Sequence, residues 1–168
     1  MSLINIPLSA DQVADAIPGV SVLKYGELCQ IGTLPLPLVV LYETQENYGH
    51  WVAILRTPEG IEHFDSYGIV PDNELKWINP QFRARSGQDV KCLLQMLYDT
   101  REPINYSTHR LQGKDSSTCG RWAILRILFS HLGTDAFARA VRAVSKKLHV
   151  TPDELVCIAV PIADHNEQ

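Results

Sequence analysis

Apolar residues gather in short runs in the first half of the chain, a pattern that is typical of strands. Leu38-Val-Val-Leu-Tyr42 is an uninterrupted apolar run and predicts a buried strand. Residues 50–56 and 60–65 predict the two arms of a hairpin, because Thr57-Pro-Glu-Gly60 between them supplies turn residues. The centre of the chain is therefore expected to form a sheet.

The segment after this hairpin is expected to be irregular. Residues 69–87 contain Pro71 and Pro80, and only a short helical turn is predicted there, near residues 72–77. The run over residues 104–111 predicts a further strand.

Apolar residues at helical spacing, together with capping patterns, predict helices towards both ends of the chain. The caps are Ser9-Ala-Asp-Gln12, Thr134 and Thr151-Pro-Asp-Glu154. The expected helices are a short one ending at Pro18-Gly19, one within residues 89–98, one from about Cys119 to His131, one from Thr134 to about Leu148, and one after Thr151. The sum is an α+β fold, with residues 1–168 as a single domain.

The composition is that of a globular protein in solution, with 45% hydrophobic and 20% charged residues, and 168 residues suit one core. No apolar run approaches the roughly 20 residues of a membrane span, and the N-terminus lacks a signal-peptide pattern, so no membrane partner is expected. A net charge of −4 and a pI near 5.8 give no reason to expect nucleic-acid binding.

The four cysteines, Cys29, Cys92, Cys119 and Cys157, are widely spaced and form no CxxC pair. A chain of this size does not need disulfides, so we expect free thiols and a reducing compartment. The six histidines do not fall at ligand spacing near the cysteines, and neither a metal site nor a cofactor is predicted.

Cys119 is the candidate nucleophile. It is expected at the start of a buried helix, where unpaired backbone N–H groups and the positive end of the helix dipole stabilise a thiolate. Gly120 would let a substrate backbone approach closely, which makes it a candidate substrate-binding residue. A buried cysteine in a helix is the structural alternative, but the polar run over residues 113–118 favours exposure.

His50 and Asp65 are the candidate base and the acid that orients it. His50 begins one arm of the predicted hairpin and Asp65 ends the other. The carboxylate could therefore hold one ring nitrogen and leave the other free to take the thiol proton. His63 is a rival base and Glu62 a rival acid on the same arm.

Gln112 lies just before the loop that leads to Cys119. A side-chain amide there, together with the backbone N–H of Cys119, would form an oxyanion hole with two donors. Asp115 in the loop is an alternative polar participant. Trp51, next to His50, is a candidate substrate-binding residue, with core packing as the other interpretation.

In this order and setting, the four residues resemble the catalytic set of the adenovirus-type proteases and the related SUMO-specific proteases. The order in that clan is His, Asp or Glu, Gln and Cys. The resemblance is carried by Gly49-His50-Trp51, Phe64-Asp65-Ser66-Tyr67-Gly68, Gln112 seven positions before Cys119, and Cys119-Gly120. The segments 62–68, 71–77 and 118–122 are most similar to maturation proteases of virophages, polinton-like viruses and other relatives of large DNA viruses. The strong match covers about residues 38–132.

The resemblance implies a central mixed sheet flanked by helices, with Cys119 heading a buried helix and His50 and Asp65 on the sheet. It implies a cysteine endopeptidase that cuts after small residues such as Gly in capsid precursors, in the host cytoplasm or nucleus and in the virion. We expect a monomer whose partner is its polypeptide substrate. A deubiquitinating or deSUMOylating protease is the alternative with the same chemistry, and an inactive binding module is the alternative without it.

Overall fold

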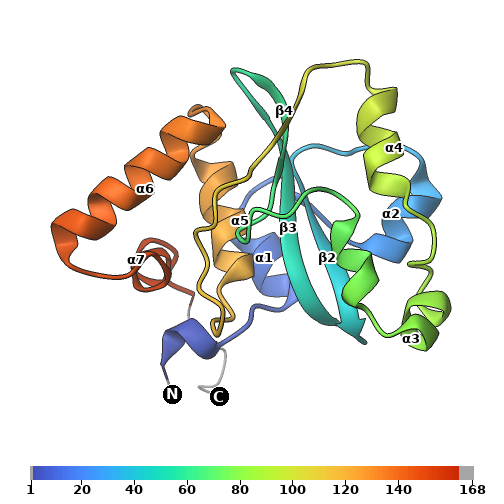
Figure 1. Ribbon diagram of the computed structural model, residues 1–168, viewed down its shortest axis with the longest axis horizontal. Coiled ribbons are helices and arrows are strands. Elements are labelled where there is room, and N and C mark those ends of the chain that lie inside the picture. Colours follow the sequence, from blue (N-terminus) through green and yellow to red (C-terminus); the bar gives the residue numbers. More distant parts are fainter. Residues whose placement is uncertain (1, 163–168) are drawn as a thin grey trace.

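A mixed five-stranded sheet runs through the middle of the molecule (Figure 1). The computed structural model describes residues 2–162. The strands follow chain order across the sheet; β1 pairs with β2 and β4 with β5 in parallel, and the two pairings between them are antiparallel. The strands are β1 (Ser21–Lys24), β2 (Leu38–Gln45), β3 (Tyr48–Thr57), β4 (Gly60–Phe64) and β5 (Ile104–Tyr106).

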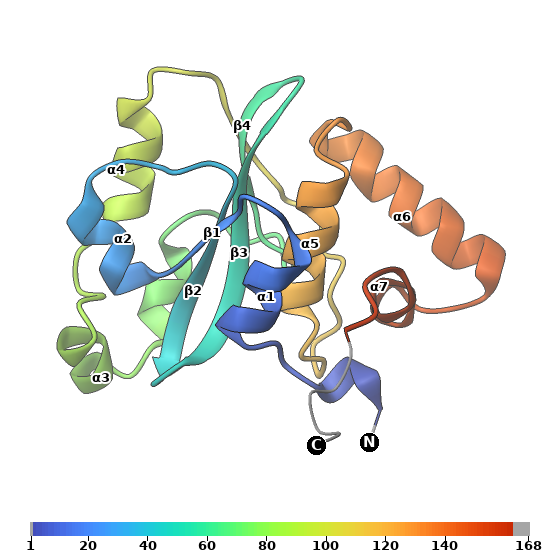
Figure 2. The same cartoon turned by 180° about the vertical axis from the view of Figure 1, so that it is seen from behind.

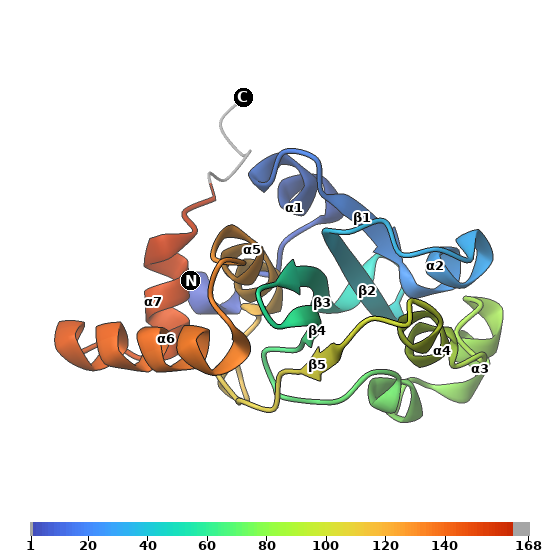
Figure 3. The ribbon, with the colours of Figure 1, turned by 90° about the horizontal axis from the view of Figure 1, so that it is seen from above.

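Helices cover both faces of the sheet, as the view from above shows (Figure 3). One layer holds α1 (Ala10–Ala16), α5 (Cys119–Leu128), α6 (Thr134–Leu148) and α7 (Pro152–Ala159); the other holds α2 (Tyr25–Ile31), α3 (Pro80–Arg85) and α4 (Cys92–Asp99). Two 3₁₀ turns complete the elements, η1 (Leu3–Asn5) and η2 (Asn73–Trp77). No helix within residues 2–162 is long and apolar enough to cross a membrane.

The alternation of side chains along β2 and β3 divides the core in two. Val39 and Ala53 face the layer that contains α5, whereas Val40, Val52 and Ile54 face the layer that contains α2 and α4. All five side chains are buried. Because helices cover both faces, these central strands are apolar along almost their whole length, which is why the run 38–42 does not alternate.

Several predicted elements are confirmed. The hairpin of β3 and β4 pairs Ala53 with Phe64 and Thr57 with Gly60. Ser9 and Thr151 each accept a bond from the backbone three residues later, so both predicted capping boxes are present. Figure 2 shows α1 and α5 side by side on one face of the sheet.

Three boundaries differ most from the prediction. The helix expected to reach about His131, α5, ends at Leu128. The strand expected over residues 104–111 ends at Tyr106, after which the chain leaves the sheet edge. Gly133, and not Thr134, is the residue that precedes α6, because the Thr134 hydroxyl donates to the carboxylate of Glu62.

Four elements were not predicted: η1, β1, α2 and α3. β1 is short and only partly buried, and the residue before α2 is Lys24, whose side chain makes no capping bond. α3 does carry a sequence signal, since Asn79 accepts bonds from two backbone N–H groups and Pro80 occupies the first turn. The Asn-Pro pair could have predicted that helix.

The expectation of free thiols is wrong for two of the four cysteines. Cys29 of α2 and Cys92 at the start of α4 form a disulfide across a sequence separation of 63 residues, with their Cα atoms 5.6 Å apart. Widely spaced cysteines cannot be paired from sequence when the fold is unknown. Cys119 and Cys157 are free thiols and both are buried, so the exposure expected of Cys119 from the polar run before it is wrong. The pairing removes the support that the cysteine pattern gave to a reducing compartment.

Candidate active site

His50 and Asp65 meet at one end of the β3–β4 hairpin. The Nε2 atom of His50 lies 3.0 Å from Oδ1 of Asp65, which directly follows β4. The backbone N–H of Tyr67 donates to the same oxygen over 2.8 Å, so the carboxylate is held from two sides. The other ring nitrogen of His50, Nδ1, is left for a second partner.

Cys119 packs against the neighbour of His50. It is the first residue of α5, and the backbone N–H of Trp51 lies 3.4 Å from its Sγ atom. Backbone N–H groups in the first turn of a helix have no partner within the helix. The structure thus brings the thiol, the imidazole and the Asp65 carboxylate together at the point where β3 meets the start of α5.

A second carboxyl group, that of Glu74 in η2, lies beside His50. Its Oε1 atom lies 3.4 Å from Nε2 of His50, and the side chain is almost fully buried. Sequence reasoning missed this residue: the turn near residues 72–77 was predicted, but nothing in the sequence indicates that it folds back onto the hairpin.

The protonation states follow from this crowding. Burial lowers the pKa of His50, but the negative charge of the carboxyl pair formed by Glu74 and Asp65, with hydrogen bonds to Asp65 and Cys119, outweighs it and holds the pKa well above 6.5. Burial raises the pKa of Asp65, and the His50 charge with bonds to Glu74 and His50 overcomes it, giving about 2. Both shifts favour an imidazolium beside a carboxylate.

An aromatic ring fixes the His50 plane. Tyr67 stacks on the imidazole with ring centroids 4.9 Å apart and an interplanar angle of 22°. The guanidinium of Arg110 lies 5.6 Å from the centroid of the Tyr67 ring. The motif 64–68 therefore supplies a stacking partner as well as an acid.

Gln112 is tied to both halves of the site. Its Oε1 atom accepts a 2.6 Å bond from the Ser66 hydroxyl, and its Nε2 atom donates over 2.9 Å to the Ser116 carbonyl. The Ser66 carbonyl accepts from the backbone N–H groups of Leu111 and Gln112. Because one N–H of the amide is used by Ser116, the second is the one that an oxyanion could take.

Asp153, near the start of α7, anchors the loop between Gln112 and Cys119. One carboxylate oxygen accepts from the Thr118 hydroxyl over 2.6 Å and from the Trp122 indole over 3.3 Å. The other accepts from the backbone N–H of Gly113 over 2.9 Å. Sequence reasoning gave Asp153 no role beyond helix capping, and its contacts join residues 31 to 40 positions apart.

Comparison with known proteins relates this chain to a virophage protein. No family model matches the chain. Over 121 residues the chain is 40% identical to a protein of the Sputnik virophage named uncharacterized protein V9, covering 70% of the chain and 69% of V9. The chain belongs to the V9 family. Membership of the V9 family indicates a virophage origin, and the name of this relative states no activity.

The rival acid is engaged elsewhere in this V9-family chain. Both carboxylate oxygens of Glu62 face Arg126 of α5, at 2.7 and 3.1 Å, and both side chains are fully buried. The guanidinium also donates to the carbonyls of Phe129 and Leu132, which close the end of α5. Glu62 therefore ties the sheet to α5.

The rival base is buried without a partner. Neither ring nitrogen of His63 has a hydrogen-bond partner within residues 2–162. Burial lowers the pKa of His63 to about 4, so its ring is neutral at physiological pH. It lies next to the pair in space and makes no bond to Asp65, which favours His50 as the base.

Trp51 and Gly120 lie against each other in the interior. The indole of Trp51 donates to the Leu8 carbonyl over 3.1 Å, and its ring is 4% exposed. A Cβ atom on Gly120 would come within 3.1 Å of the Trp51 ring and 3.2 Å of Leu8. Gly120 is thus required for packing of α5 on β3, and the substrate contacts expected of the two residues stay predictions.

A metal ion was not expected, yet one donor set merits note. Single ligand atoms of His50, Asp65 and Glu74 lie within 4.8 Å of one another. These are the same three side chains that form the close contacts of His50 with Asp65 and Glu74 described above.

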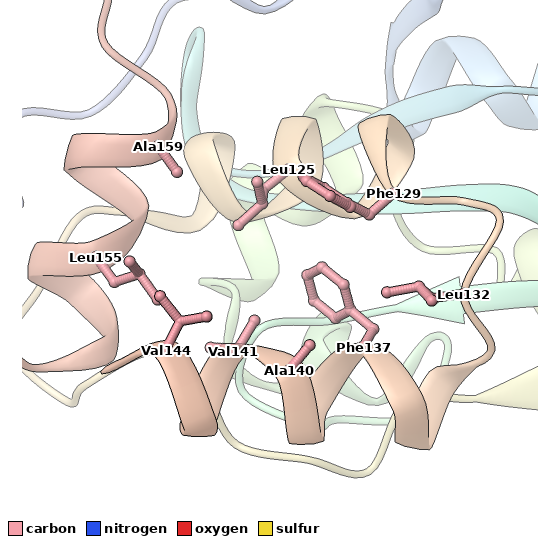
Figure 4. Close-up of a pocket in the computed structure, with 9 residues that line it drawn as sticks. All are labelled: Leu125, Phe129, Leu132, Phe137, Ala140, Val141, Val144, Leu155 and Ala159. Atoms are coloured by element: carbon pink, nitrogen blue, oxygen red, sulfur yellow. The ribbon is translucent and has the colours of Figure 1, made fainter. Parts of the chain in front are cut away.

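An apolar groove lies at the opposite end of α5 from Cys119 (Figure 4). It has a volume of about 190 Å³ between α5, α6 and α7, and no polar side chain lines it. Its walls include Leu125 of α5, Phe129 directly after α5 and Val141 of α6. None of the candidate active-site residues contributes to it.

Proposed function

We propose that this protein is a cysteine endopeptidase that works through an acyl-enzyme. His50 takes the thiol proton of Cys119, and the thiolate attacks the carbonyl carbon of the scissile peptide bond. The oxyanion is held by the free N–H of Gln112 and the backbone N–H of Cys119. Collapse expels the amine, which His50 protonates, and water then hydrolyses the thioester with His50 as base.

One observation carries the proposal: the 3.0 Å contact between His50 Nε2 and Asp65 Oδ1, made beside a thiol that heads a buried helix. This contact fixes which ring nitrogen remains for the proton of Cys119. The raised pKa of His50 favours the imidazolium, which is the form that stands beside a thiolate.

The substrate we propose is a viral structural precursor, cut after a small residue such as Gly. Two findings support this choice: the resemblance of residues 38–132 to adenovirus-type maturation proteases, and membership of a virophage family. The mixed sheet with helices on both faces is compatible with an adenain-type fold, which we propose for this chain.

The test is a cleavage assay on the purified chain with a library of Gly-containing peptides, read by mass spectrometry, alongside Cys119→Ala. We expect cuts after small residues by the wild type and none by the variant. Cys157→Ala is the matched control, because Cys157 is the second free, buried thiol. Rapid labelling of Cys119 by a thiol-reactive ubiquitin or SUMO probe would redirect the proposal to a ubiquitin-like substrate. Near-wild-type activity in Cys119→Ala would overturn it.

A further inference from the structure

Glu74 has no role in the mechanism above, yet its carboxyl group is buried beside the two charged partners of the site. It is 7% exposed, and Oε1 lies 3.4 Å from Nε2 of His50. Asp65 holds the same nitrogen more closely, at 3.0 Å. A single N–H cannot serve both acids equally well, so Glu74 requires a different partner.

Two buried oxygens without hydrogen-bond partners indicate which group that partner is. Oδ2 of Asp65 and Oε1 of Glu74 are both buried, and neither has a hydrogen-bond partner within residues 2–162 when both groups are written as carboxylates. Buried acceptors without a donor are costly, and two adjacent buried carboxylates repel each other. A single proton on Glu74 removes both costs, because a carboxylic acid can donate to the free oxygen of Asp65.

The backbone holds Glu74 firmly in this place. Asp72, directly before η2, adopts a left-handed backbone with φ of 67°. Its N–H donates to the Tyr42 hydroxyl over 3.1 Å, and its carboxylate accepts from Tyr25 and from the N–H of Leu94. These bonds join η2 to β2, α2 and α4, so the approach of Glu74 to His50 is built into the fold.

We propose that Glu74 is a positioning residue and a neutral carboxylic acid at physiological pH. Its O–H donates a hydrogen bond to Oδ2 of Asp65, and this bond keeps Oδ1 of Asp65 on His50. The inference deepens the proposed function and rests on it. Asp65 then carries the one negative charge of the carboxyl pair, and His50 faces a fixed anion. Glu74 acts through Asp65 and does not touch the substrate.

The electrostatics of the site support this assignment. Burial is the largest influence on Glu74 and raises its pKa; the His50 charge opposes it, and Asp65 adds to it, giving about 10. Asp65 moves the other way, to about 2. The other titratable groups that face the three residues are Tyr42, His63, Tyr67 and Cys119.

The first test needs no turnover and uses the Cys119→Ala protein. At neutral pH the infrared spectrum of Cys119→Ala should contain the carbonyl band of a protonated carboxylic acid. That band should be absent from the spectrum of the double variant Cys119→Ala/Glu74→Gln. The His50 pKa, followed by NMR, should change by less than about half a unit in Glu74→Gln, because no charge is lost. An ionised Glu74 would instead give no such band, and its removal would lower the His50 pKa by about one unit or more. That result would overturn the proposal.

The second test measures catalysis. Glu74→Ala removes the donor and should lower kcat about tenfold or more with little change in KM, whereas Glu74→Gln should recover most of that loss, since its amide can donate to Asp65. Glu46→Ala, at an exposed acid, is the control. Equal losses in Glu74→Ala and Glu74→Gln would contradict the proton-donating role. If no peptide is cut by any variant, the proposed function fails, while the infrared and NMR results still decide the state of Glu74.

Discussion

The hydroxyl of Ser66 donates a 2.6 Å hydrogen bond to Oε1 of Gln112, and this bond joins the acid side of the site to the oxyanion side. Ser66 directly follows Asp65 and is 1% exposed. Its carbonyl also accepts the backbone N–H groups of Leu111 and Gln112. One buried serine thus orients the Gln112 amide so that its nitrogen, and not its oxygen, faces the loop before Cys119.

Ser66→Ala should therefore weaken catalysis without abolishing it. The Gln112 amide would lose the bond that sets its orientation but would keep its N–H groups, so the cost should stay below the roughly 3–4 kcal/mol of losing an oxyanion donor outright. We expect kcat to fall by about 10- to 100-fold with KM nearly unchanged, and Gln112→Ala to fall at least as far. Steady-state kinetics check this, with Ser130→Ala outside the site as control. A fall in Ser66→Ala that exceeds that in Gln112→Ala would show another role for Ser66.

The two neighbouring histidines should separate sharply in activity. His50→Ala removes the base and should reduce kcat/KM by about 100- to 10,000-fold. His63→Ala should be far milder, because neither ring nitrogen of His63 bonds to Asp65 or to any other group within residues 2–162. Peptide cleavage by the two purified variants gives the ranking. The reverse order would make His63 the base.

His63 should also make stability depend on pH. Its pKa is about 4 in the folded protein and about 6.5 when unfolded, so the unfolded state binds the extra proton first. Its contribution is fully present above pH 6.5 and is lost as the pH falls towards 4, by about 3 kcal/mol in total. Urea unfolding of wild type and His63→Leu between pH 4 and 7 measures it. The difference in unfolding free energy between wild type and His63→Leu should change with pH. The difference between wild type and His131→Gln, the control at an exposed histidine, should stay constant.

The buried ion pair between Glu62 and Arg126 should serve stability and not catalysis. Glu62→Gln leaves the guanidinium of Arg126 buried without its counter-charge, which costs about 3–5 kcal/mol. We expect a lower urea midpoint, with kcat/KM of the folded fraction within about threefold of wild type. Arg56→Gln is the control, since Arg56 pairs with Glu102 at the surface. A selective loss of kcat without destabilisation would return Glu62 to the list of candidate acids.

The disulfide between Cys29 and Cys92 should stabilise the layer of α2 and α4. A cross-link over 63 residues is worth about 4 kcal/mol on the loop-entropy estimate. Reductant should lower the urea midpoint of the wild type and leave that of a Cys29→Ala/Cys92→Ala double variant unchanged. Equal midpoints of the wild type with and without reductant, confirmed by thiol counting, would show that the bond is absent or adds nothing.

Local signals predicted much of this molecule, and long-range contacts account for what was missed. The run 38–42, the hairpin turn and the caps at Ser9 and Thr151 depend on neighbouring residues, and each is confirmed. The strand over 104–111 was overextended: pairing with β4 stops at Tyr106, opposite His63, and residues 107–110 beyond it are polar.

The candidate site shows the same division. His50 and Asp65 were predicted as a pair because a hairpin brings its two arms together, and they lie 3.0 Å apart. Glu74 could not be predicted, since its approach depends on bonds from Asp72 to residues 22 to 47 positions away. The disulfide between Cys29 and Cys92 could not be predicted for the same reason.

The contacts of Asp153 determine when the site can form during synthesis of the chain. The loop before Cys119 gains its anchors on Thr118, Trp122 and Gly113 only from a residue at the start of the last described helix. On the ribosome, Cys119 and His50 emerge well before residue 153. A nascent chain therefore carries its nucleophile on an unanchored loop until Asp153 has left the ribosome and α7 has packed against that loop.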